Sequence, residues 1–211
     1  MNDNSQIDRP KRIRRTPEVS RAAAIQAAHK LLIEHGPAAV TLQAVARAAN
    51  MTHGNLSHHF GTSAALQAAM ILEMAGQLTQ RASLLVSGMR AGSVPAAMIV
   101  DLVFDGFAAG GYGRLIASLT ASGGTSQLAP FFDALKASVE ALRAGEPGDV
   151  NQETHGAGPI VMGLLGHAFA ASLFGRELEV AAGMPAGSLR KLATRQLESL
   201  RAIPHSTNGA D

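Results

Sequence analysis

The spacing of apolar residues in the first third of the chain predicts a run of short helices. The first begins with Thr16 as N-cap and Pro17 at the first helical position, both common at helix starts. Apolar residues then recur on one face as far as Leu32, and Gly36, followed by proline, ends the pattern. The sequence therefore predicts a helix over residues 17–35.

Two shorter helices follow at once. Thr41 opens the second, which ends at Asn50, a residue type that tolerates positive φ. Thr52 caps the third, in which Leu56 and Phe60 stand four residues apart and can share a buried face. Two short helices joined by a few turn residues predict a helix-turn-helix.

The exposed face of this third helix carries short polar groups. If its two apolar residues point inward, the most outward positions are Gly54, Asn55 and His58, with His53, Ser57 and His59 on the flanks. Asn can make a bidentate contact to adenine, His can donate to bases or phosphate, and Gly lets the backbone approach closely. The alternative is that the histidines are ordinary surface residues.

Beyond the third helix, helical candidates are separated by glycine-rich breaks. They are a fourth helix capped by Thr62-Ser63 and reaching about Ser87, then Val94–Ala109, Gly113–Ala121, Ala129–Ala144, Pro159–Arg176 and Pro185–Ile203. The 39 Ala and 22 Gly residues, with no Trp and one Tyr, favour helices packed through small side chains over strands. We expect an all-α protein of about nine helices.

The net charge of +2 is unevenly distributed. Residues 1–60 hold eight Lys and Arg against four Asp and Glu, a balance of +4, whereas residues 61–211 hold ten against twelve, a balance of −2. Five of the positive charges fall within seven residues, at Arg9, Lys11, Arg12, Arg14 and Arg15. Such a basic arm attracts polyanions, usually nucleic acid; the alternative is a solvated tail.

Residues 21–66, RAAAIQAAHKLLIEHGPAAVTLQAVARAANMTHGNLSHHFGTSAAL, resemble the DNA-binding domain of the tetracycline-repressor (TetR) family of transcriptional regulators. The resemblance implies an all-helical homodimer with a three-helix DNA-binding domain and a helical domain that binds a small molecule and dimerises. It does not imply an enzyme. The predicted DNA-binding residues are the arm together with Thr41, Gln43, Arg47, Thr52, His53, Gly54, Asn55, Ser57, His58, His59 and Ser63.

Two positions depart from the family pattern and bear on DNA affinity. Ser57 stands where Tyr is common, and Ser63 stands where a Lys commonly meets phosphate. Both exchanges remove contacts that position the protein on the DNA backbone. Because phosphate attraction is largely additive, the basic arm and Arg47 are candidates to compensate.

The predicted domain division is a basic arm over 1–15, a DNA-binding domain over 16–62 with its motif at about 41–60, and an effector-binding and dimerisation domain over 63–211. In the last of these, Gly163, Gly166 and Ala170 form a small-residue strip that would allow close helix contact. We expect the last two helices of each subunit to form the homodimer interface. Two DNA-binding domains related by a two-fold axis would match a palindromic, double-stranded operator.

We expect a small-molecule effector site in the same domain. The sequence does not identify the molecule. Its candidate lining combines apolar and polar side chains: Met98, Asp101, Phe104, Asp105, Tyr112, Phe131, Met162 and His167. The alternative is that the apolar members are core and the two aspartates a solvated helix face. No spacing typical of a metal or cofactor site is present.

Two other classes of protein compete with a DNA-binding regulator. An enzyme is disfavoured because the chain has no Cys and no G-x-S-x-G, H-E-x-x-H or G-x-x-x-x-G-K-[ST] motif. A membrane-associated protein would use the 20 uncharged residues Gly156–Gly175 as a span, but their Gly, His and Ala content favours a helix buried at an interface. The first residues lack the apolar stretch of a signal peptide, so we expect a cytoplasmic protein without a membrane partner.

Overall fold

The computed structural model describes residues 16–144 and 156–199, and its regular structure in these ranges is entirely helical. The helices are α1 (Pro17–His35), α2 (Leu42–Ala48), α3 (His53–Phe60), α4 (Ser63–Arg90), α5 (Ala96–Phe107), α6 (Tyr112–Ala121), α7 (Ala129–Arg143), α8 (Ala157–Ala181) and α9 (Ser188–Ser199). Short 3-10 helices occur at Pro37–Ala39 and Thr125–Leu128. The all-α prediction is confirmed for the part of the chain described.

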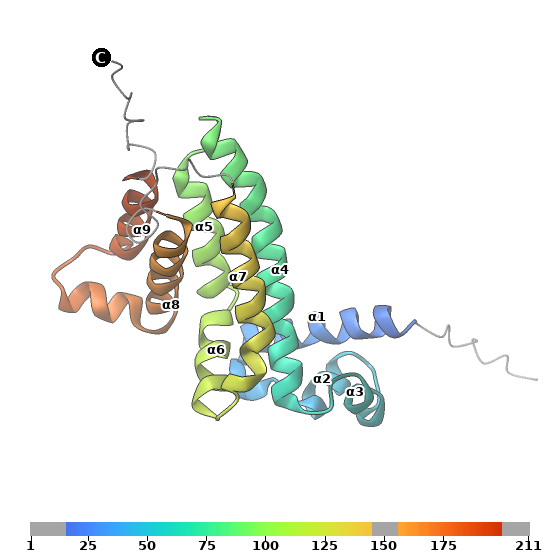
Figure 1. Cartoon of the computed structure of the whole chain (residues 1–211). Coiled ribbons are helices and arrows are strands. Elements are labelled where there is room, and N and C mark those ends of the chain that lie inside the picture. The colour runs from blue at the N-terminus through green and yellow to red at the C-terminus, as the bar shows by residue number, and fades with distance from the viewer. Residues whose placement is uncertain (1–15, 145–155, 200–211) are drawn as a thin grey trace, which may run out of the picture.

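Helices α1–α3 form a small unit, here called the head (residues 16–62), at one end of the molecule (Figure 1). Its core is made by fully buried side chains from all three helices, including Leu32, Val45 and Leu56. The predicted bounds of the first helix are confirmed, and Asn50 adopts the positive φ of 54° expected between α2 and α3.

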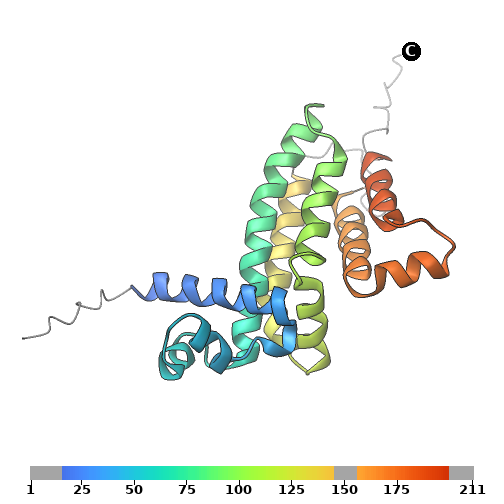
Figure 2. The ribbon, with the colours of Figure 1, turned by 180° about the vertical axis from the view of Figure 1, so that it is seen from behind.

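The remaining helices form the body (residues 63–144 and 156–199). The 28-residue α4 runs from the head along the body, and α5 and α7 lie beside it (Figure 1). Helix α6 packs against α4 and α5 near the head, while α8 and α9 cover the side away from α4 (Figure 2). Buried residues of both units belong to one continuous apolar core.

Helix α8 is bent within its length. Phe174 has φ −152° and ψ 30°, outside the helical region, and the residues after it project from the body (Figures 1 and 2). Glu179, nearly buried, fixes this projecting half: its carboxylate accepts hydrogen bonds from the backbone N–H groups of Gly187 and Leu189, both at 3.0 Å. The bend therefore turns the chain so that α9 can pack back on α8.

Three predicted helix starts in the body are wrong by two or three residues. Helix α8 begins at Ala157, not Pro159, and ends at Ala181, five residues after the predicted end at Arg176. The fifth helix begins at Ala96, not Val94, because Pro95 is extended (φ −71°, ψ 146°) and disfavours helix in the residue before it. The last helix, α9, begins at Ser188, not Pro185. At its start the carboxylate of Glu179 accepts hydrogen bonds from the N–H groups of Gly187 and Leu189. Its predicted end at Ile203 lies outside the described residues.

Candidate functional site

The α2–turn–α3 segment is built by local hydrogen bonds. Thr41 Oγ1 accepts from Ala44 N and Thr52 Oγ1 accepts from Asn55 N, each at 3.2 Å, so both helices have side-chain N-caps. Between them Met51 N donates to Ala46 O at 2.8 Å. These bonds close the turn and set the direction in which α3 leaves it.

Helix α3 presents one apolar and one polar face. Leu56 is fully buried and Phe60 is 8% exposed, so the inward pair is as predicted. The positions predicted to point outward do so: His53, Gly54, Asn55 and His58 are exposed, with Ser57 and His59 half-buried on the flanks. Ser57 Oγ lies 3.5 Å from His53 Nδ1, which links two of these side chains.

Gly54 leaves an open place in the middle of this polar face. A Cβ built there would meet no atom within 4 Å apart from its own helix backbone and chain neighbours. Asn55 beside it uses its backbone N–H for the cap, and no hydrogen bond to another residue of the described ranges engages either end of its side-chain amide. The face can therefore offer donors and acceptors to base edges, and a backbone approach at Gly54.

Basic side chains stand on either side of α3. Arg47 near the end of α2 is exposed. Arg21 on α1, which the sequence reasoning missed, places its guanidinium 4.7 Å from the centre of the Phe60 ring, at the end of α3. The signal for Arg21 was available, since it continues the basic segment into α1. The arm residues Arg9 to Arg15 lie outside the described residues.

Glu18 is the acidic neighbour of this region. A hydrogen bond from its own backbone N–H and one from the Thr16 side chain lower the pKa of Glu18, and the charge of His59 adds to the effect. Its carboxylate is fully exposed, so this interaction is screened by solvent. The interaction between Glu18 and His59 shows that the start of α1 lies near the end of α3.

Ser63 and Gln67 join the head to α4. Ser63 Oγ accepts from Leu42 N, the first helical residue of α2, at 3.0 Å, and Gln67 Nε2 donates to Val40 O at 2.9 Å. Ser63 is half-buried, and its hydroxyl serves primarily to cap α2. Thr41 and Gln43 nearby are exposed at the start of α2.

The predicted effector residues lie on several helices of the body. Asp101 and Asp105 bind Arg190 of α9, at 2.5 and 2.9 Å, and Phe104 is buried beneath that guanidinium. Phe131, half-buried on α7, packs edge-on against Phe132, while Met98 and Met162 are exposed. His167 Nδ1 donates to Gly163 O at 2.6 Å on its own helix.

Asp105 and Tyr112 do line a cleft, but one that also includes the head. It has a volume of about 770 Å³ and lies between α1, α4 and the α5–α6 connection. Burial, followed by the charge of Glu73, raises the pKa of Tyr112 to about 12, so its phenol is neutral and can donate a hydrogen bond. The α1 wall of this cleft was not predicted, because α1 was assigned to the DNA-binding domain.

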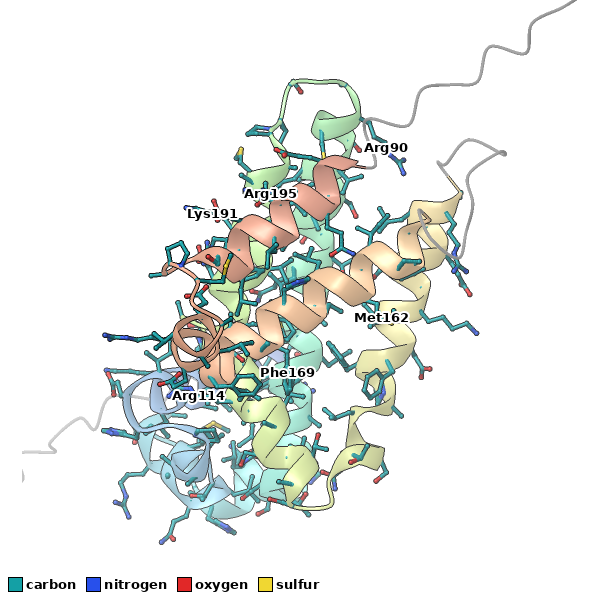
Figure 3. The ribbon with its side chains drawn as sticks, turned by 90° about the vertical axis from the view of Figure 1, so that its left-hand side faces the viewer. Arg90, Arg114, Met162, Phe169, Lys191 and Arg195 are labelled. Atoms are coloured by element: carbon teal, nitrogen blue, oxygen red, sulfur yellow. The ribbon has the colours of Figure 1, made fainter. Side chains whose placement is uncertain are left out.

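A second exposed surface lies on α8, its projecting half and α9. Apolar side chains are exposed there, with basic ones nearby; Figure 3 shows Met162 and Phe169 on α8 and Lys191 and Arg195 on α9. The exposed apolar residues are Met162, Leu173, Phe174, Leu178, Val180, Met184 and Leu192. We call this set the α8–α9 surface.

Of the small-residue strip predicted on α8, Gly163 makes a close helix contact. A Cβ there would lie 2.4 Å from the Gln196 side chain of α9, whereas a Cβ at Gly166 would meet nothing within 4 Å. Within the described ranges, α8 is also the one helix long and apolar enough to cross a membrane by length and composition, and 11% of its most apolar window is buried. No three His, Asp or Glu side chains of the described residues gather as a metal site would require.

Comparison with known proteins gives a match for the head and for the fold. Residues 24–70 match the sequence model described as bacterial regulatory proteins, tetR family. The fold is similar to the multidrug binding protein EbrR complexed with ethidium, at 19% identity over 86% of this chain and 99% of that chain, with a TM-score of 0.58. It is also similar to the fatty acid degradation regulator FadR from Bacillus halodurans, at 15% identity over 86% and 96% of the two chains, with a TM-score of 0.54. No curated protein sequence matches significantly.

Proposed function

We propose that this protein is a repressor that binds a palindromic operator as a homodimer and leaves the operator when a small molecule binds. The proposal starts from the match to the tetR family of bacterial regulatory proteins, to which the chain belongs as a DNA-binding transcriptional regulator. The observation that carries the proposal is the exposed polar face of α3, held outward by the buried pair Leu56 and Phe60. A helix in this position can enter the major groove.

In this proposal Asn55 and His58 read base edges, because they are exposed on the outermost part of α3. Gly54 lets the helix come close to the bases, and His53, Ser57 and His59 contact the groove walls. Thr52 and Thr41, whose hydroxyl oxygens cap their helices, still have a hydroxyl proton to donate to phosphate.

Phosphate attraction comes from the basic residues on both sides of α3. Arg47, Arg21 and the arm supply positive charge, and Gln43 and Ser63 are further candidates at the start of α2 and α4. Because Ser63 caps α2, we assign it first to orienting the helix-turn-helix and only second to phosphate. Such contacts set affinity and register but do not select sequence.

The α8–α9 surface is the proposed homodimer interface. Exposed apolar side chains such as Phe174 (47%), Val180 (70%) and Met184 (45%) provide apolar area whose burial against a second copy would be favourable. Packing of α8 against α5, α6, α7 and α9 supports an interface helix over a membrane span. The projecting half of α8, fixed by Glu179, is suited to reach the other subunit.

Release by an effector requires that the small molecule bind one arrangement of the heads more tightly than the other. The similarity in fold to a multidrug binding protein complexed with ethidium supports a small-molecule ligand for this chain. In a homodimer, a change in the separation of the two heads would remove the match to successive major grooves.

The test is selection of bound fragments from random DNA by the purified full-length protein, followed by anisotropy titrations on the selected sequence. We expect a palindrome. Asn55→Ala should lower the preference for the selected site by about 1–3 kcal/mol. His58→Ala should weaken binding to the selected site, whereas its matched control His35→Ala, which alters an exposed histidine at the far end of α1, should leave binding unchanged.

Removal of residues 1–15 should weaken binding to all DNA sequences and reduce the magnitude of the slope of log affinity against log salt by up to about 4.5, if the five basic residues each release about 0.9 counterion. Selection of no common sequence, or an unchanged affinity of the Asn55→Ala variant, would contradict the assigned roles.

A further inference from the structure

The cleft between head and body has the size and construction of a small-molecule site. Its volume of about 770 Å³ falls within the range typical of ligand pockets. One wall is α1 of the head; the others are α4 and the α5–α6 connection of the body. An occupant would therefore touch both units at once.

An aromatic pair joins the two sides. The rings of His29 on α1 and Tyr112 at the start of α6 stack with centroids 5.2 Å apart and planes 22° apart. His29 Nε2 is buried without a hydrogen-bond partner among the described residues, and the ring stacks on that of Tyr112. The stack forms a flat face, and burial, followed by the charge of Glu73, raises the pKa of Tyr112 to about 12, so its phenol is neutral at physiological pH.

Glycines bring the two units close together beside this pair. Gly111 has φ +74°, and a Cβ there would lie 3.2 Å from Leu32 of α1. Across the cleft floor, a Cβ at Gly106 on α5 would lie 3.3 Å from Leu78 of α4. The head thus rests against the α5–α6 connection at the point where the cleft opens.

The carboxylates of the cleft differ in their partners. Asp105 binds Arg190, and Glu34 pairs with Lys30 at 3.9 Å. Glu73 has no ion pair within the described residues; its Oε1 accepts one hydrogen bond from Gln77 Nε2 at 3.4 Å. The Glu73 carboxylate is therefore an anion of the cleft whose charge is not neutralised.

Arg81 on the same wall forms no ion pair with Glu73 among the described residues. It follows Glu73 by eight residues on α4, about 12 Å along the helix axis. Between them the floor is apolar, with Met74 buried and Leu78 half-buried. A carboxylate next to an aromatic face and an apolar floor favours an organic cation.

We propose that this cleft binds a small organic cation with an apolar body, with its positive charge at Glu73 and its body against Met74, Leu78 and the His29–Tyr112 stack. The inference rests on the proposed function, for which it names the chemical class and the site of the effector. Because the occupant contacts α1 together with α4 and α6, it favours one orientation of the head relative to the body and so changes operator affinity.

The chain offers a direct probe, since Tyr112 is its only tyrosine and lies in the cleft. Incorporation of 3-fluorotyrosine gives a single ¹⁹F resonance that reports occupancy of this place. Tetraphenylphosphonium is the probe cation, and tetraphenylborate, of nearly the same shape and opposite charge, is its control. Calorimetry on the full-length protein without DNA measures affinity.

We expect tetraphenylphosphonium to bind and shift the ¹⁹F resonance, and tetraphenylborate to bind much more weakly. Glu73→Gln should reduce the affinity for the cation about tenfold, whereas Glu140→Gln, an exposed carboxylate on α7, should leave it unchanged. Both variants alter exposed side chains, and equal melting temperatures will confirm that they fold.

Equal binding of the two probes, an unmoved ¹⁹F resonance, or an unchanged affinity of Glu73→Gln would overturn the cleft assignment. Because these measurements need no DNA, they stay interpretable if the protein selects no operator, which would refute the proposed function instead. If an operator is selected, the cation should weaken operator binding by the wild type more than by Glu73→Gln; equal effects would overturn the coupling.

Discussion

The head and the body begin their helices in different ways. Each helix of the head, and α4 that follows it, starts at a threonine whose hydroxyl accepts from the N–H three residues later: Thr16, Thr41, Thr52 and Thr62. Helices α5, α6, α7 and α8 have no side-chain hydrogen bond at their caps, and α9 takes its acceptors from Glu179 on α8. The α-helices of the head thus carry local caps, with Ser63 adding a distant acceptor at the start of α2, whereas the one side-chain cap found in the body beyond α4 within the described residues, that of α9, comes from another helix.

This difference should not extend to the cores, where both units depend on burial. Leu56→Ala in the head and Leu119→Ala in the body remove side chains that are 0% and 2% exposed. Each should lower the free energy of unfolding by about 2–5 kcal/mol, through lost burial and the cavity left behind. Urea denaturation followed by circular dichroism measures the change, and a loss below about 1 kcal/mol in either variant would mean that its unit repacks.

The non-local cap of the body is the next largest effect. Glu179→Ala leaves two backbone N–H groups at the start of α9 without their acceptor and should cost about 1–3 kcal/mol. Glu179→Gln keeps one oxygen acceptor in place and should cost less. If the two variants unfold at the same urea concentration as the wild type, α9 is positioned by packing on α8 alone.

The smallest expected effect is that of a single local cap. Thr52→Ala removes the acceptor for Asn55 N and should destabilise the head by about 1 kcal/mol. Thr52→Ser retains the hydroxyl and is the matched control, with stability close to that of the wild type. A loss in Thr52→Ala as large as that in Leu56→Ala would indicate that the cap, not the core, holds α3.

The same contrast explains what the sequence could predict. The start of α1 at Pro17, the turn at Asn50 and the inward pair on α3 follow from neighbouring residues, and the structure confirms them. The start of α9 could not be read from nearby positions, because its cap comes from a residue nine positions before Ser188, across a turn.

The candidate ligand site was harder to predict for a related reason. A cleft is formed by side chains from several helices, and the angle between helices is not encoded in the spacing along any one of them. The sequence analysis grouped Asp101, Phe104 and Met162 as candidate lining residues. In the structure Arg190 forms an ion pair with Asp101 and lies over the Phe104 ring, and Met162 is exposed. His29 and Glu73 were not predicted as lining residues, because α1 was assigned to DNA binding and α4 was considered only as the helix that follows the DNA-binding domain.

Gly54 has a consequence for how such a protein changes over evolutionary time. It lies on the exposed face of α3, and a Cβ introduced there meets no atom within 4 Å apart from its own helix backbone and chain neighbours. Glycine is also a poor helix former, so most replacements would strengthen α3 by about 0.5–1 kcal/mol. Single-codon changes at this position can therefore generate new operator preferences without a loss of stability, which makes it a natural starting point for the divergence of duplicated copies.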